Sequence, residues 1–247
     1  MNSIRLRSLS NQEAGAPLSR SESAYERIRI EILTFGLMPG ELVSEVSLAE
    51  RYKLSLAAVR AILSRLRHEG LLINMKRRGQ MVSPVTFEDI NNTYQLRYLL
   101  EPTAAEQAVG KVDVDELKQL DEQASSSAPA NDRKALLETI LAHRAFHLAI
   151  AAACTNEQLA QWIFQLNDKV LRYLYLDLRN SETHGIGWHN SHTGIIDAIV
   201  NGEPERAADA MRADIDSGLK MVSQAILHLP DFRKLNLAGV DFEKLEN

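Results

Sequence analysis

Apolar side chains recur every three or four residues along most of this chain, which is the spacing of one face of a helix. Over residues 21–35 the recurring positions are Ala24, Ile28, Ile32 and Phe35. A Met-Pro-Gly turn at residues 38–40 ends that stretch. The pattern therefore begins with a helix and a turn, preceded by a polar tail at residues 1–18 that has no periodicity.

The next stretch predicts two short helices. Ser47 can cap the first one, and Glu50 three residues later would complete a capping box. Ser55 can cap the second one. The apolar residues of the second helix share one face and are Val59, Leu63 and Leu66. Gly70 is the expected end of this second helix.

A hairpin with a basic tip comes next. Residues 71–74 and 80–83 have the composition of short strands, and residues 75–79 form the turn between them. A helix presented to the major groove beside a cationic hairpin is a winged helix-turn-helix, so the module at residues 19–85 predicts DNA as its partner. The residues expected to contact DNA are Ser55, Arg60, Arg65, Lys76, Arg77, Arg78 and Gly79.

The rest of the chain, residues 86–229, shows helical spacing and no alternating strand pattern. Pro102 interrupts the first of its helices and predicts a kink. The helices are expected at residues 89–109, 113–125, 133–153, 158–178, 188–201 and 203–227, with a Ser-rich loop at 125–129 and a C-terminal tail at 230–247. The predicted fold class is mainly α, with an N-terminal winged helix-turn-helix followed by an all-helical bundle.

Charge is distributed unevenly along the chain. Residues 1–86 hold 13 Lys and Arg against 8 Asp and Glu, whereas residues 87–247 hold 15 against 25. A basic head on an acidic body indicates that only the head meets a polyanion. The single cysteine, Cys154, excludes an internal disulfide framework and fits a reducing compartment. With no apolar run of the ~18 residues that a membrane span needs and no signal peptide, we expect a cytoplasmic protein without membrane contact.

Two histidines stand out in the bundle. His143 and His147 are four residues apart on one predicted helix, so they project from the same face. Ile140 and Ile150 lie near that face, which indicates that it points inward. Such a pair is more often a surface or core pair than a metal site, and on spacing alone both interpretations stay open.

The order of these elements and their motifs resembles the GntR family of bacterial transcription regulators, in the FadR-type branch with a helical FCD effector domain. In the head, the motifs that carry the resemblance are Pro39-Gly40-Glu41-Leu42, Leu48-Ala49-Glu50, Val59-Arg60, Glu69-Gly70-Leu71 and Arg77-Arg78-Gly79. In the body, they are Leu96-Arg97, Leu100-Glu101, Phe146-His147, His192 and Ala207 through Met211.

The head departs from the family at four positions of the second helix of its helix-turn-helix. Where the family commonly has Arg, Thr, Pro and Glu, this chain has Leu56, Ala57, Ala58 and Ala61. Arg60 is retained. The resemblance therefore implies a changed operator preference, because fewer groups can bond to base edges.

The resemblance also implies a metal site, since many FCD domains hold a divalent ion with one Asp and three His. The matching residues are His143, His147, His192 and Asp214, with the first and last exchanged relative to the usual order. Such a set suits zinc, nickel, manganese or iron. Arg97 and Asn156 match family residues and imply a small carboxylate as effector. Their alternatives are an ion pair of Arg97 with Glu101 and a helix cap by Asn156.

Taken together, the resemblance implies a homodimeric, ligand-responsive regulator of operator DNA, commonly a repressor released by its ligand. Two alternatives stay open. One is a metal-dependent enzyme in the helical domain, although no general base neighbours the histidines. The other is a metal-free ligand-binding module with weakened DNA binding. We expect a regulator and no enzymatic activity.

Overall fold

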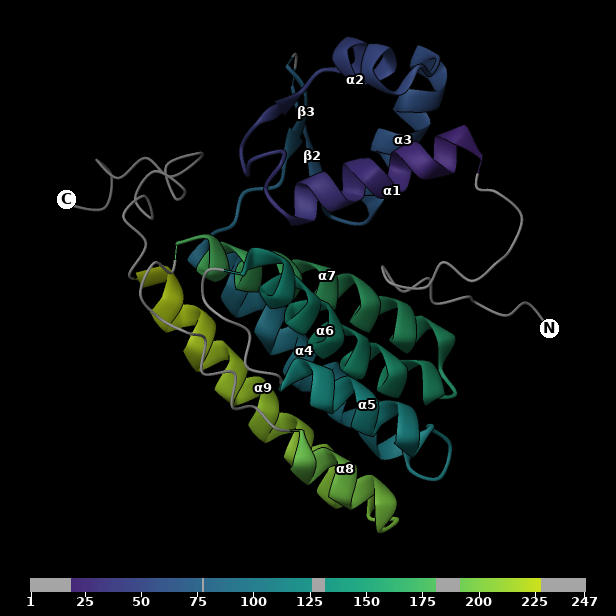
Figure 1. Ribbon diagram of the computed structural model, residues 1–247, viewed down its shortest axis with the longest axis vertical. Helices are drawn as coiled ribbons and strands as arrows, with labels where there is room; N and C mark the ends of the chain where they lie inside the picture. Colours follow the sequence, from purple (N-terminus) through teal and green to yellow (C-terminus); the bar gives the residue numbers. More distant parts are fainter. Residues whose placement is uncertain (1–18, 77, 126–131, 181–191, 228–247) are drawn as a thin grey trace. The chain divides into compact units, whose positions relative to one another are not determined.

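The structure, a computed structural model, describes residues 19–76, 78–125, 132–180 and 192–227. The described residues form two compact units, a head that runs to Phe87 and a body that starts at Glu88 (Figure 1). The predicted tails at 1–18 and 230–247 and the loop at 126–129 lie outside the described residues, as does Arg77.

The elements have the predicted order. The head contains α1 (Arg20–Leu33), β1 (Leu42–Val43), α2 (Glu45–Tyr52), α3 (Leu56–His68), β2 (Leu72–Met75) and β3 (Gly79–Val82). The body contains α4 (Phe87–Ala108), α5 (Val114–Ala124), α6 (Arg133–Ala153), α7 (Glu157–Asn180), α8 (Thr193–Val200) and α9 (Pro204–Leu227). The predicted fold class is thereby confirmed: a winged helix-turn-helix precedes a helical bundle.

The head packs α1 and α3 around one apolar core. Ile28 and Ile32 of α1 and Val59 and Leu66 of α3 are fully buried, as their helical spacing predicts. The three strands form one antiparallel sheet in the order β1-β3-β2, in which Ile73 pairs with Met81. Strands β2 and β3 form the predicted hairpin. Leu72 and Val82 of these strands are buried, so the apolar core fixes the position of the hairpin as well as that of α3.

Two helix boundaries in the head differ from the prediction. Ser44, not Ser47, caps α2, and its Oγ accepts a hydrogen bond from the backbone N–H of Ser47 at 3.2 Å. The reason is that β1 ends at Val43, so that the helix starts directly after the strand. The first helix ends at Leu33, and Phe35 is buried beyond it with a φ of 55°. The Ser55 cap is confirmed, since its Oγ accepts from Ala58 N at 3.2 Å.

In the body, α6 packs against both α5 and α7, and α8 packs against α9 (Figure 1). Pro102 lies inside α4, where the sequence places it, and is buried; the kink stays a prediction. The helix expected from residue 188 begins at Thr193 within the described part. None of the described helices combines the length and the apolar character needed to cross a membrane.

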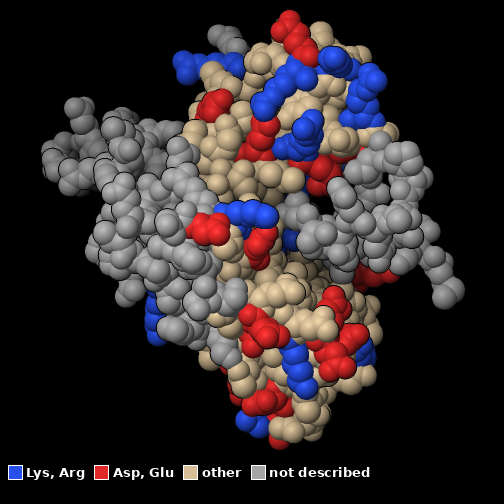
Figure 2. All heavy atoms as spheres, in the orientation of Figure 1, with Lys and Arg blue, Asp and Glu red and all other residues tan. Residues whose placement is uncertain are grey.

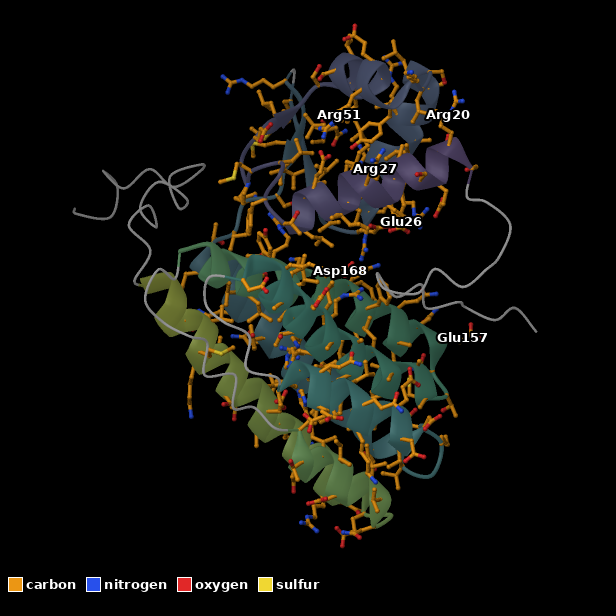
Figure 3. All side chains as sticks on the ribbon, in the orientation of Figure 1. Arg20, Glu26, Arg27, Arg51, Glu157 and Asp168 are labelled. Atoms are coloured by element: carbon orange, nitrogen blue, oxygen red, sulfur yellow. The ribbon has the colours of Figure 1, made fainter. Side chains whose placement is uncertain are left out.

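Polar contacts between helices set the position of α4 and α7. At the start of α4, Asp89 accepts hydrogen bonds from Tyr173 at 2.6 Å and from Lys169 at 2.6 Å, both on α7. Between α6 and α7, the buried Arg144 Nη2 lies 2.7 Å from Asp168 Oδ1, a residue labelled in Figure 3. These contacts fix the helices whose inner faces carry the histidines and their partners.

Candidate functional site

Three histidines converge inside the body. His143 and His147 come from successive turns of α6, and His192 is the residue that precedes α8. The ring centroids lie 4.7 Å apart for His143–His147, 4.9 Å for His143–His192 and 5.4 Å for His147–His192. One ring nitrogen of each lies within 4.8 Å of the others, and all three residues are buried. His143 and His147, which the sequence places on one face of a helix, thus both lie close to the ring of His192.

Asp214 of α9 completes a group of four residues that we call the histidine cluster: His143, His147, His192 and Asp214. The Oδ2 atom of Asp214 is 3.4 Å from His147 Nε2, and its Oδ1 is 3.7 Å from His192 Nε2. The structure therefore brings the three histidines together and places Asp214 beside two of them.

A buried carboxylate of α4 orients His147. Glu101 Oε2 lies 2.8 Å from His147 Nδ1, and Glu101 also accepts from Arg97 Nε at 2.6 Å and from Asn167 Nδ2 at 3.0 Å. Burial alone would raise the pKa of Glu101, but the charges of Arg97 and His147 outweigh it and lower the pKa to about 2. Glu101 is thus a carboxylate, and an ionised carboxylate can only accept.

A second carboxylate, from α5, orients His192. Asp121 Oδ1 lies 2.8 Å from His192 Nδ1 and accepts from the backbone N–H of His192 at 2.9 Å. Burial opposes the charge of Asp121, yet the hydrogen bonds from His192 dominate and lower its pKa. On its other side, the His192 ring stacks on Phe146 at 4.0 Å between centroids. A carboxylate oxygen therefore lies 2.8 Å from Nδ1 of both His147 and His192.

These contacts decide which ring atoms face the centre of the cluster. The Nε2 atoms of His147 and His192 are buried and have no hydrogen-bond partner among the described residues, and the same holds for Nδ1 of His147 by hydrogen-bond geometry, although it lies close to Glu101. Burial, together with the neighbouring rings and Arg97, lowers the pKa of His143 well below its ordinary value, which favours the neutral form of this ring. Ring nitrogens of His147 and His192 thus face the carboxylate of Asp214, an arrangement that a cation between them would stabilise.

In the head, Arg60 is exposed on α3. Its Nε donates to Glu45 Oε2 of α2 at 2.8 Å, and both side chains are open to solvent. Ser55 is exposed at the start of the same helix. Lys76 and Arg78 lie at the hairpin tip, where Arg78 N donates to Met75 O at 3.0 Å and Gly79 has a φ of 92° that suits glycine. These residues are accessible to a large ligand.

Arg65 has partners inside the head instead. Its guanidinium lies 3.5 Å from the centroid of the Tyr25 ring, 3.2 Å from Glu22 and 3.4 Å from Glu69. Tyr25 donates to Glu69 Oε1 at 2.6 Å. Arg65 therefore ties α3 to α1, and contact with DNA would have to compete with these interactions.

Basic side chains gather over the head, and acidic ones predominate on the body face drawn in Figure 2. Figure 3 labels three of the cations of the head, which are Arg20, Arg27 and Arg51. The basic side chains that the sequence concentrates in residues 1–86 are thus on the surface of the head, the unit that carries α3 and the hairpin.

Two family descriptions match this chain. "Bacterial regulatory proteins, gntR family" covers residues 20–82, and "FCD domain" covers residues 92–217. The chain belongs to the GntR family, in the branch with an FCD domain. It is a transcriptional regulator with a DNA-binding head and an effector-binding body.

Known proteins are similar over most of the length of this GntR regulator. It is 25% identical over 213 residues to the HTH-type transcriptional repressor GlaR of Escherichia coli, covering 83% of this chain and 97% of GlaR. It is 26% identical over 214 residues to the uncharacterized HTH-type transcriptional regulator BphR of Paraburkholderia xenovorans, covering 82% and 85%. The fold is also that of E. coli McbR/YncC, with a TM-score of 0.69 at 20% identity, covering 84% and 99%. These relatives confirm a regulator rather than an enzyme.

The two residues expected to bind the effector of this GntR regulator have structural partners. Arg97 is buried and bonded to Glu101, as the ion-pair alternative predicts. Asn156 is exposed and caps α7, with its Oδ1 accepting from Gln158 N at 3.1 Å and Leu159 N at 3.2 Å. Arg97 is connected to His147 through Glu101, whereas the described contacts of Asn156 are those of a helix cap.

Asp121 and the second role of Glu101 were not predicted from the sequence. A signal for Asp121 was present, because it shares one helical stripe with Leu117 and Ala124, which are both buried. An acidic residue on a buried stripe needs a partner. The i,i+4 spacing indicates only the pairing of Glu101 with Arg97, although a carboxylate has room for several donors.

Proposed function

We propose that this regulator is a metal-dependent repressor that binds operator DNA through α3 and the hairpin tip and senses a small organic acid in its body. The observation that carries the proposal is the histidine cluster, in which one ring nitrogen of each of the three histidines lies within 4.8 Å of the others while a carboxylate oxygen lies 2.8 Å from Nδ1 of both His147 and His192. The similarity to GlaR, a repressor by name, supports the sign of regulation.

The histidine cluster fits a divalent metal ion by its chemistry. It offers three imidazole nitrogens and one carboxylate, which suit zinc, nickel, manganese or iron. Carboxylates on the outer ring nitrogens are the usual support of metal-binding histidines. When bound, such an ion supplies a Lewis acid with open positions for a carboxylate oxygen.

The effector is proposed to be a small carboxylate. Arg97 would help indirectly, because its charge keeps Glu101 ionised and Glu101 fixes His147. Asn156 stays a prediction as an effector ligand, with the capping role observed beside it. Binding at the cluster would alter the contacts of α6, α8 and α9 and so shift the regulator between states of different DNA affinity.

DNA contact is proposed for the exposed residues of the head. Arg60 would contact a base or phosphate from α3, Ser55 a phosphate, and the hairpin tip of Lys76, Arg77, Arg78 and Gly79 the minor groove. Arg65 would contribute mainly by tying α3 to α1. A two-fold dimer is proposed, because paired heads match the two halves of a palindromic operator.

Elemental analysis of the purified protein tests the metal. Protein from metal-replete growth should carry about one divalent ion per chain, and His147→Ala and His192→Ala should each lose it. His68→Ala is the matched control, since His68 lies on α3 in the head and should leave the metal content unchanged. Metal-free wild-type protein, or full occupancy in both cluster variants, would contradict the proposal.

DNA binding is tested with labelled duplexes from upstream of the regulator's own gene. We expect retardation whose equilibrium constant falls with salt and which small organic acids weaken in the metal-loaded protein. If retardation is absent in low salt while an organic acid raises the melting temperature, the body is a binding module and the repressor proposal is wrong.

A further inference from the structure

The amino-terminal half of the outward face of α3 has few hydrogen-bonding groups. The helix buries Val59, Ile62, Leu63 and Leu66 on its inner side. Its opposite side is the stripe of Ala57, Ala61, Ser64 and His68, spaced three or four residues apart. Ala57 and Ala61 are exposed, and Leu56 at the first helical position is 43% exposed. The stripe begins with methyl groups and becomes polar only towards its end.

The polar groups of this stripe are bonded within the helix. His68 Nδ1 lies 2.7 Å from the carbonyl oxygen of Ser64, and Ser64 Oγ accepts from Arg67 Nη2 at 3.3 Å. From Leu56 through Leu63, Arg60 is the one residue with a polar side chain. In helix-turn-helix proteins, the amino-terminal residues of the second helix contact base edges. That part of α3 can therefore offer one guanidinium and several apolar groups.

Glu45 limits how the guanidinium of Arg60 can turn. The Arg60 Nε donates to Glu45 Oε2, which occupies one edge of the planar group and leaves the edge formed by its two Nη atoms for another acceptor. Two donors that point the same way match the O6 and N7 acceptors of one guanine. We therefore expect Arg60 to contact a single base pair.

The apolar groups also have one matching feature in the major groove, the C5-methyl group of thymine. Contact with that methyl removes apolar surface from water and is favourable, whereas the N4 amino group of cytosine would lose a water partner and gain none. The basic character of the head supports DNA, rather than an apolar protein surface, as the occupant of this face.

We propose that α3 selects operator half-sites by their thymine methyl groups, which contact Leu56, Ala57 and Ala61, with Arg60 reading one guanine per half-site. This inference rests on the proposed DNA-binding function. The operator half-sites would then be rich in thymine where α3 enters the major groove. Their specificity would come from shape and methyl contacts rather than from several hydrogen bonds to base edges.

Replacement of thymine by deoxyuridine tests the inference directly. The full-length protein first selects its preferred duplex from a random pool, and the affinity is then measured with thymines changed to deoxyuridine, which pairs identically but lacks the methyl group. Each contacted methyl should contribute about fourfold in affinity. In a site changed from thymine to cytosine, 5-methylcytosine should restore part of the lost binding.

Leu56→Gln provides the matched variant. It changes an exposed side chain and should keep the fold while it reduces the sensitivity to deoxyuridine. Val46→Ala, at an exposed apolar residue on α2, should keep the wild-type sensitivity. If a preferred duplex binds equally well with and without methyl groups, the inference is wrong and the proposed function stands. If no duplex binds even in low salt, both are wrong.

Discussion

The head and the body contain arginine–carboxylate pairs of similar length in opposite environments. Arg60 Nε lies 2.8 Å from Glu45, with the two side chains 65% and 36% exposed. Arg97 Nε lies 2.6 Å from Glu101, with both side chains 2% exposed. An exposed pair contributes about 0–1 kcal/mol, whereas removing one partner of a buried pair costs about 3–5 kcal/mol.

The difference in solvent exposure gives the two arginine–glutamate pairs different roles. The pair of the head can adjust to a DNA acceptor on the Nη atoms of Arg60 at small cost, because water already surrounds both groups. The pair of the body cannot be opened cheaply, and it serves to hold Glu101 against His147. Substitutions in the head and in the body can test whether burial alone accounts for the different free-energy contributions of such pairs.

Glu101→Ala should have the strongest effect of all on stability. It leaves the Arg97 guanidinium buried without its main partner, and the free energy of unfolding should fall by about 3–5 kcal/mol. Chemical denaturation of the purified protein measures the change. The control is Glu138→Ala, which removes an exposed partner of Lys134 at the same i,i+4 spacing and should change stability by a few tenths of a kcal/mol. Equal effects of the two variants would contradict the contrast between buried and exposed pairs.

Asp121→Asn should weaken metal binding with little effect on folding. The amide keeps the size of the side chain but no longer provides the negative charge that orients His192 and makes it a better ligand. We expect about 10–100-fold lower affinity in competition with a chromophoric chelator. Glu122→Gln, at an exposed neighbour on α5, should bind as the wild type does. Unchanged affinity in Asp121→Asn would mean that the carboxylate does not support the ligand.

Arg60→Ala should leave stability unchanged within about 0.5 kcal/mol and weaken the preferred duplex by about 1–3 kcal/mol. Arg60→Lys should not restore binding, because a single ammonium lacks the planar pair of donors. Arg51→Ala is the matched control: Arg51 is exposed and bonded to Glu31 at 2.6 Å, and its removal should affect all duplexes alike. Titration of preferred and random duplexes at several salt concentrations distinguishes the two variants.

The buried Tyr25 should cause a smaller loss of folding stability at high pH. Burial, reinforced by the hydrogen bond to Glu69, raises the pKa of the Tyr25 phenol above its ordinary value near 10. Above that pH the unfolded chain loses this proton while the folded head retains it, so stability should fall as pH rises, by at most about 1.4 kcal/mol per pH unit. Tyr25→Phe should reduce the loss between about pH 9 and 11, and Tyr98→Phe, at an exposed tyrosine, should not. Urea midpoints measure this, and identical pH profiles for wild type and Tyr25→Phe would overturn it.

Local patterns in the sequence predict the fold well. Helical spacing identifies the buried face of α3, and the i,i+4 spacing of His143 and His147 places both rings on one side of α6. The two-residue strand β1 could not be predicted, since it exists only through its pairing with β3. That strand also decides which serine caps α2, and the prediction of Ser47 was wrong for the same reason.

The residues of the candidate site could not be predicted from local sequence patterns alone. His192 and Asp214 were assigned only through resemblance to a family, because their approach to α6 depends on how α8 and α9 pack. Periodicity shows that Asp121 lies on a buried stripe of α5, but it does not show which residue lies opposite. The contact with His192 is a property of the packed bundle.

Glu101 receives donors from three helices, from Arg97 on its own α4, from His147 on α6 and from Asn167 on α7. Any change to one of these four residues therefore affects the other three, and they have to be treated as one unit. A new ligand at position 147 would leave the carboxylate with an altered set of donors, and compensating changes would be needed on two other helices. The position of the His147 ring is in this sense determined well outside α6.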